Sequence, residues 1–246
     1  MTVMNAPETR VSFLVAVPIR AVVEIAAGRI LCVASERSDA TVEVRPDDAT
    51  RSSDVTAARR TRVDFDVGVL HVGTERSVPR VLGDSGSVDV TVHLPSGSGV
   101  AATSAVGAFH GVGPLGEVVF EGAAGSVVIE EATAVRLVLE SGDVAVGRLA
   151  GPGEIRTQRG DITVAEARQG LVTLHTGTGR ISIGAAPGVA ATLDAGVGPG
   201  RIINTLRNSD GARAALNIHA TTAHGDITAR SLDKEQHHDP HHPSAV

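Results

Sequence analysis

The sequence predicts an all-β protein and, within that class, a β-solenoid of about 18 residues per coil with a β-meander cap at its N-terminal end. Two observations lead to this class. One short pattern is written three times with nearly equal spacing, and apolar residues alternate with small or polar residues around each copy. The copies read GDVAV at 142–146, GDITV at 160–164 and GRISI at 179–183. Such a period is typical of repeat architectures.

Each repeat contains two short strands, one on either side of its glycine. Val144 and Val146 follow the glycine at alternate positions, and a second apolar pair, Val135 and Leu137, precedes it. A unit with so few inward side chains cannot bury them alone, so copies must stack above and below it. Stacking at a strand spacing of about 4.8 Å aligns equivalent residues into ladders. The expected ladders are Val127, Val144, Ile162, Ile181, Ile202 and Ile227 in one, and Ile129, Val146, Val164 and Ile183 in the next.

A glycine marks the turn of each predicted coil, because a residue without Cβ adopts a positive φ at no steric cost. The predicted turn glycines are Gly107, Gly125, Gly142, Gly160, Gly179, Gly200 and Gly225. Their spacing lengthens toward the C-terminus, which predicts that residues 187–199 and 207–213 are loops on the last coils. Atypical terminal units are expected where a repeat stack is capped.

The position after the turn glycine points outward in this arrangement. It is occupied in chain order by Ser126, Asp143, Asp161, Arg180, Arg201 and Asp226. A row of carboxylates suggests calcium, but the ligand-rich GGxGxD pattern is missing from the sequence and arginines interrupt the acids. We expect instead that Asp143 and Asp161 accept hydrogen bonds within their own turns, with Asp161 beside Arg180 of the next coil.

The N-terminal region is predicted to contain a loose segment at residues 1–10 and the meander and cap at residues 11–94. Residues 46–62 are polar and are predicted to form a loop with one helical turn near 54–60. Because the turn at 95–99 is too short for an interdomain linker, the solenoid repeats are predicted to follow directly over 95–232.

Residues 11–27 are apolar, but a proline, an arginine and a glutamate interrupt them. A membrane span needs about 20 uninterrupted apolar residues, and a signal peptide needs a basic segment before a clean apolar run. We interpret this stretch as strands of a folded domain and expect a cytoplasmic protein. The lone cysteine, Cys32, excludes an internal disulfide, and its alternating surroundings predict a buried structural thiol.

Composition narrows the classes of function. Aromatic residues make up 2% of the chain, with neither Trp nor Tyr, so the core must be aliphatic. The same scarcity argues against binding sugars or single-stranded nucleic acid by ring stacking. The formal net charge is −6, without a cluster of basic residues, which argues against duplex nucleic acid.

The C-terminal residues 233–246 are predicted to be a disordered, histidine-rich tail. Imidazole is a ligand for zinc and nickel, so the tail has four candidate metal ligands. They are His237, His238, His241 and His242. Because two prolines prevent a helix that would bring these side chains together, we expect opportunistic metal affinity and not a selected site. No cofactor is expected.

Three features together resemble a known family: the run of Gly-Asp-Val/Ile-x-Val repeats, the first coil AATSAVG at 101–107 and the closing TTAHGDI at 221–227. They look like a bacterial family of β-strand-repeat proteins of unknown function labelled putative adhesins, common in high-GC actinobacteria. The resemblance covers roughly residues 11–232. It implies a β-solenoid and a name, "adhesin", that rests on analogy of fold. It implies no catalytic residue.

Three functions remain open from the residues. The first is a non-catalytic scaffold or interaction module that binds an unknown protein partner. The second is a scaffold that polymerises end to end through exposed terminal edges. The third is a β-helix enzyme that acts on polysaccharide, for which Asp143 and Asp161 would be the stacked carboxylates, while His175 and His219 stand isolated in the sequence. We expect the first function and no enzymatic activity.

Overall fold

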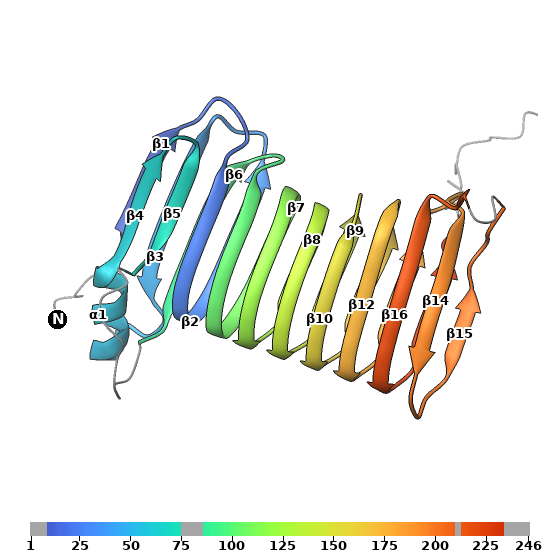
Figure 1. Cartoon of the computed structure of the whole chain (residues 1–246). Helices are drawn as coiled ribbons and strands as arrows, with labels where there is room; N and C mark the ends of the chain where they lie inside the picture. Colours follow the sequence, from blue (N-terminus) through green and yellow to red (C-terminus); the bar gives the residue numbers. More distant parts are fainter. Residues whose placement is uncertain (1–8, 75–85, 210–212, 234–246) are drawn as a thin grey trace, which may run out of the picture.

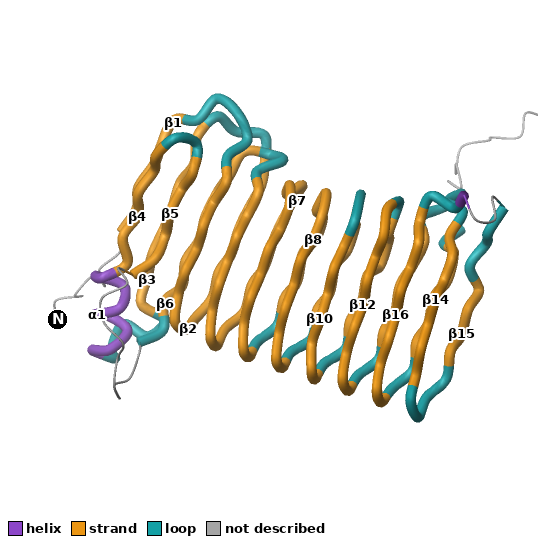
Figure 2. Tube along the Cα trace, viewed as in Figure 1, coloured by secondary structure: helices purple, strands orange, loops and turns teal. Residues whose placement is uncertain are grey.

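The computed structural model describes residues 9–74, 86–209 and 213–233, and this part of the chain is nearly all β, which confirms the predicted class (Figure 2). The elements are β1 (Thr9–Leu14), β2 (Arg20–Ser35), β3 (Asp39–Pro46), α1 (Ser52–Arg60), β4 (Thr61–Asp66), β5 (Val69–Thr74), β6 (Val88–Pro95), β7 (Gly99–Ala124), β8 (Val127–Ser141), β9 (Val144–Leu149), β10 (Gly153–Arg159), β11 (Ile162–Ala167), β12 (Gly170–Thr178), β13 (Ile181–Ala185), β14 (Ala191–Val197), β15 (Ile202–Thr205), β16 (Leu216–His224) and β17 (Ile227–Ser231).

Strands in the middle of the chain pair in parallel and skip one strand each time. β8 pairs with β10 and β10 with β12, while β9 pairs with β11 and β11 with β13. The register joins equivalent positions of successive repeats, so that Val144 lies opposite Ile162 and Ile162 opposite Ile181. Alternation in the sequence therefore predicted both the strands and their register over this stretch.

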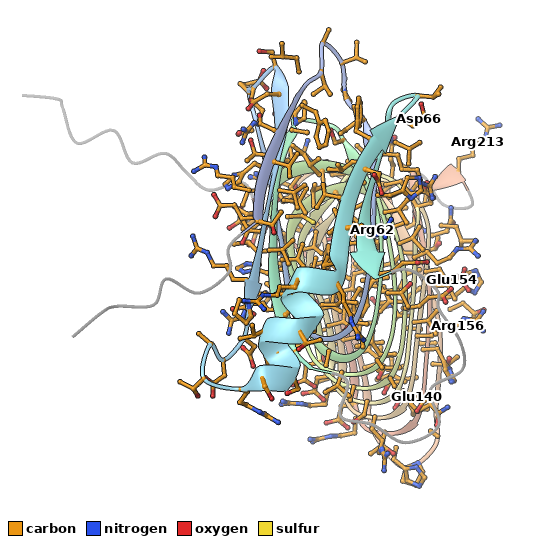
Figure 3. The ribbon with its side chains drawn as sticks, turned by 90° about the vertical axis from the view of Figure 1, so that its left-hand side faces the viewer. Arg62, Asp66, Glu140, Glu154, Arg156 and Arg213 are labelled. Atoms are coloured by element: carbon orange, nitrogen blue, oxygen red, sulfur yellow. The ribbon has the colours of Figure 1, made fainter. Side chains whose placement is uncertain are left out.

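The strands form two walls with side chains packed between them (Figures 1 and 3). We call the row of β10, β12, β16 and β14 the first wall, and the row of β9, β11, β13, β17 and β15 the second wall. β8 belongs to both, because its residues 127–132 pair with β9 and its residues 135–141 pair with β10.

The core between the walls is aliphatic, as the composition predicted. Ile155, Ile162 and Leu174 are completely buried. Phe109 and Phe120 supply the aromatic part, with ring centroids 5.4 Å apart. Cys32 is buried among the inward residues of β2, as predicted. Each wall alone would expose one apolar face, so burial between two walls is the main force that holds the stack together.

The last two units are stacked out of chain order. β16 pairs with β12 on one side and β14 on the other, and β17 lies in the same way between β13 and β15. The predicted ladder from Ile181 to Ile202 to Ile227 is therefore wrong in its last steps, because Ile227 lies between the other two. Residues 187–199 are not simply a loop, since they contain the whole of β14. Any parallel edge accepts a matching strand, and the long connection after β15 lets the chain return to the edge of β12 and β13.

The N-terminal region differs from the predicted meander. β2 is a single strand of 16 residues that pairs in parallel with β7 on one side and with β5 and β6 on the other. The predicted meander is wrong at β2, because this strand pairs in parallel, and not antiparallel, with its neighbours on both sides. Antiparallel pairs join β1 to β3, β3 to β6, and β4 to β5 at the end of the stack. The predicted helical turn is the helix α1, and the buried carboxylate of Asp54 accepts backbone N–H bonds from Asp48 and Ser87.

Candidate functional site

The turn glycines form a continuous ladder along one corner of the stack. In spatial order the ladder contains Gly28, Gly107, Gly125, Gly142, Gly160, Gly179, Gly225 and Gly200. A Cβ on Gly142 would lie 1.6 Å from the carbonyl oxygen of Gly125, and one on Gly160 would lie 2.0 Å from that of Gly142. Close backbone approach therefore demands glycine at this corner.

Backbone conformation adds to this demand at most of the predicted turn glycines. Those at 125, 142, 160, 179 and 225 have φ between +143° and +151°. Gly107 and Gly200 lie on the same ladder without a φ in that region. At these two positions the approach of the neighbouring coil, and not the turn conformation, requires the missing side chain.

Carboxylates at the next position link one coil to the following one. Asp143 Oδ1 accepts a bond of 2.8 Å from the backbone N–H of Asp161, and Asp161 Oδ1 accepts one of 2.8 Å from the N–H of Arg180. The predicted bonds within their own turns are therefore wrong, because each carboxylate accepts its backbone bond from the next repeat instead. Asp161 stands beside Arg180 as predicted, with Oδ2 2.8 Å from Nη2. The backbone N–H of Arg180, together with its guanidinium, holds the pKa of Asp161 below its usual range.

Buried threonines tie the first wall to the glycine corner. Thr176 Oγ1 donates to the carbonyl oxygen of Gly160 at 2.9 Å, and Thr222 Oγ1 donates to that of Gly179 at 3.1 Å. Each carbonyl belongs to the neighbouring coil, so these bonds fix the spacing between coils. The corner is thus a structural device whose polar groups are already occupied.

The outer side of the first wall carries a mixed-charge surface, which we call the polar face. It consists of Arg136, Glu154, Arg156, His175 and His219. Glu154 contacts both arginines, at 3.7 Å from Arg136 Nη2 and 2.8 Å from Arg156 Nη2. Glu154 and Arg156 project outward side by side from this wall (Figure 3). The parallel register holds these groups in rows one strand spacing apart.

Histidines that stand alone in the sequence have partners on the polar face. His175 Nδ1 lies 2.8 Å from Thr221 Oγ1 on the adjacent strand. His219 Nδ1 lies 3.1 Å from Asp194 Oδ2. The second pair joins β14 to β16, which would be neighbours in chain order as well. The first pair joins β12 to β16, so it depends on the exchanged order, which the sequence did not indicate.

A small hollow lies where β4 and β5 meet β2. Its charged and titratable lining comes from Glu24, Arg62, Asp64 and His71, and its volume is about 160 Å³. Pockets that hold drug-sized ligands are about 300–1,000 Å³. The hollow therefore has room for waters or an ion but not for a sugar ring with its neighbours.

The remaining sequence-predicted features are the four tail histidines, the lone cysteine and the apolar N-terminal stretch. His237, His238, His241 and His242 lie outside the described residues. Within the described ranges, no group of three or more His, Cys, Asp or Glu side chains is arranged to hold a metal ion. Burial raises the pKa of the Cys32 thiol to about 12, which suits a structural role. In the part of the chain that the structure describes, no helix combines the length and the apolar character of a membrane span.

Comparison with known proteins gives fold-level likeness alone. No family model matches the chain, and no curated protein matches it. Among solved structures, it is similar to a "putative cell adhesion protein" from Clostridium sporogenes ATCC 15579, at 10% identity over 92% of this chain and 100% of that one, with a TM-score of 0.39. A "putative adhesin" from Bacteroides fragilis NCTC 9343 gives 13% identity, 92% and 98% coverage and a TM-score of 0.40. A "putative adhesin" from Parabacteroides distasonis ATCC 8503 is 13% identical over 93% of this chain and 98% of that one, with a TM-score of 0.39. Likeness at this level carries no conclusion about function.

Proposed function

We propose that the chain is a non-catalytic β-solenoid that acts as a scaffold or protein-interaction module, as the adhesin resemblance implies. The observation that carries this proposal is the polar face. A regular wall fixes Arg136, Glu154 and Arg156 in rows, so their order is set before any partner arrives and little conformational entropy is lost on binding. Interleaved charges of both signs suit a protein surface of complementary pattern.

The state of the stacked carboxylates supports a non-catalytic function. Asp143 and Asp161 both accept backbone bonds from the next coil, and Asp161 is also paired with Arg180. A general acid or base must exchange protons with substrate, so it needs an oxygen that is free to reach it and a pKa near the working pH. Asp161 instead has a lowered pKa. These carboxylates serve the stack, which disfavours the polysaccharide-acting alternative.

A pair of charge reversals tests the polar face. Arg156→Glu reverses a charge on the first wall, and Arg230→Glu makes the same change on the exposed side of β17 in the second wall. The native chain is cross-linked in its own cells, and the captured proteins are compared with those captured by each variant. We expect Arg230→Glu to capture the same proteins and Arg156→Glu to lose them. Both variants should have equal unfolding midpoints. Identical cross-linked proteins for both variants, or none for the native chain, would contradict the proposal.

A second candidate is a self-assembling scaffold, and one observation favours it. Among the described strands, β14 pairs only with β16 and β15 only with β17. The far edge of both strands therefore presents backbone groups with no strand partner in the described chain. Such edges are templates for another strand. Association that depends on concentration would support this candidate.

A further inference from the structure

In the part of the chain that the structure describes, no strand lies beyond β14 and β15 at the C-terminal end of the stack, and the core side chains there are only partly covered. Ile227 of β17 points between the walls and is completely buried, whereas Ile202, which lies opposite it on β15, is 43% exposed. On the first wall, Ile218 is buried and its partner Leu193 on β14 is only partly so. These inward side chains are exposed because none of the described strands pairs with the far side of β14 or β15.

The edge at this end is only partly protected against pairing, since the Ala191 N–H of β14 donates to the carbonyl oxygen of Arg207. β15 reads IINT and has no charged residue, and Ile203 on its outer side is 48% exposed. β14 has one charged residue, Asp194. Natural proteins protect such edges with charges, prolines or bulges. A short apolar, β-branched edge without them favours strand addition.

The opposite end of the stack is closed. The Phe13 ring on β1 and the Phe65 ring on β4 meet with centroids 5.3 Å apart. The edge strand β4 carries Arg62, Asp64 and Asp66, and it crosses this end together with α1 (Figure 3). An uncovered apolar coil would bury its core side chains poorly against this charged edge, so head-to-tail growth is disfavoured.

We infer that two copies of this chain join through their C-terminal coils, β14 and β15 against the same strands of the second copy, across a two-fold axis. This inference deepens the self-assembly candidate and rests on it. A two-fold axis perpendicular to the stack reverses strand direction, so the edges of the two copies meet as antiparallel strands. Because β15 is uncharged, the meeting edges bring no like charges together there.

The size of this end sets the strength of the pair. The seven residues of β14 span about 23 Å, and the walls lie about 10 Å apart, so the end of the core has an area of about 230 Å² per copy. A total of about 460 Å² is below the roughly 1,000 Å² of stable specific interfaces, so the pair must be weak. The pair is therefore reversible, and it closes as a dimer because the edge strand β4 at the Phe13 end is charged and disfavours the addition of an apolar strand.

Sedimentation equilibrium of the full chain from micromolar to millimolar concentration tests the inference. The mass should rise and level off at twice the chain mass of 25.1 kDa. Ile203→Lys, which adds a charge to each edge, should weaken dimerisation at least tenfold. Val128→Lys is the matched control, because Val128 is an exposed residue in the same outward row of the second wall, far from the edge. Circular dichroism should show both variants folded.

Three results of these experiments would contradict the inference, and each can be told apart from the others. A monomer at every concentration would remove both the dimer and the self-assembly candidate, while leaving the polar face to its own test. A mass that passes two copies would replace the dimer with a polymer. Deletion of residues 234–246 should leave the dimer unchanged. If only the shortened chain associates, that segment covers the end and the inference is wrong.

Discussion

Asp161 receives two donors from Arg180 across one step of the stack, the backbone N–H at Oδ1 and the guanidinium at Oδ2, each at 2.8 Å. Any residue except proline at position 180 could donate the backbone N–H, whereas the second donor needs the arginine side chain. One carboxylate thus joins two coils through both backbone and side chain. The sequence predicted Arg180 of the next coil beside Asp161, but it placed the backbone donor in Asp161's own turn.

The Asp161 carboxylate should make stability depend on pH. Its folded pKa is lowered, so its contribution is complete above the unfolded pKa of about 3.9 and is lost as the pH falls through the folded value. Asp161→Asn should lower the free energy of unfolding by no more than about 1 kcal/mol at pH 7, because the pair is partly exposed. Urea unfolding should show that this loss of stability becomes smaller as the pH falls to 3. Glu140→Gln, an exposed change on the same molecule, should show no such trend, and a cost for Asp161→Asn that is constant with pH would contradict the assignment.

Gly142→Ala should be among the most destabilising changes to the corner. The new Cβ would meet the Gly125 carbonyl and would also be held at φ +149°. Gly188→Ala separates the two effects, since Gly188 has φ +80° with open space around it, and its cost should be about 1–2 kcal/mol. We expect Gly142→Ala to cost clearly more in urea unfolding. Equal costs would mean that coil contact at the corner is unimportant.

Cys32 should react with thiol reagents only when the stack opens. Its burial and raised pKa leave almost no accessible thiolate in the folded chain at pH 8. The rate of labelling should therefore follow the unfolding equilibrium as denaturant is added.

Stability should also fall at alkaline pH, since the unfolded thiol ionises from about pH 8.5 and the folded one only near 12. Rapid labelling without denaturant would contradict this burial.

Much of the fold was predictable because burial alternates along each coil. Val144 and Val146 are buried while Ala145 between them is partly exposed, and the sequence records that alternation directly. The same signal was present earlier, since Gly28-Arg29-Ile30 repeats the arrangement of Gly179-Arg180-Ile181. The repeat pattern at the N-terminal end was therefore present in the sequence, although the alternation there predicted a meander.

The order of the last coils was not predictable from alternation. Every coil offers a similar parallel edge, so the residues that face the core do not say which neighbour covers them. The available hints were indirect: Ile202 and Ile203 break the alternation, and a long connection follows them. The contact of His175 with Thr221 on the polar face was missed for the same reason, because β12 and β16 are neighbours only in the exchanged order.

The stacking order of the C-terminal coils is tested most directly by paired cysteines on the outer side of the first wall. Thr173 lies opposite His219, and His219 opposite Asp194. Thr173→Cys with His219→Cys, and Asp194→Cys with His219→Cys, should each form a disulfide under mild oxidation, because neighbouring strands bring their Cα atoms within bonding reach. Thr173→Cys with Asp194→Cys should not, since those strands are separated by β16. A disulfide in the last pair, without one in the first, would mean that the coils follow chain order, which would contradict the uncovered β14–β15 end.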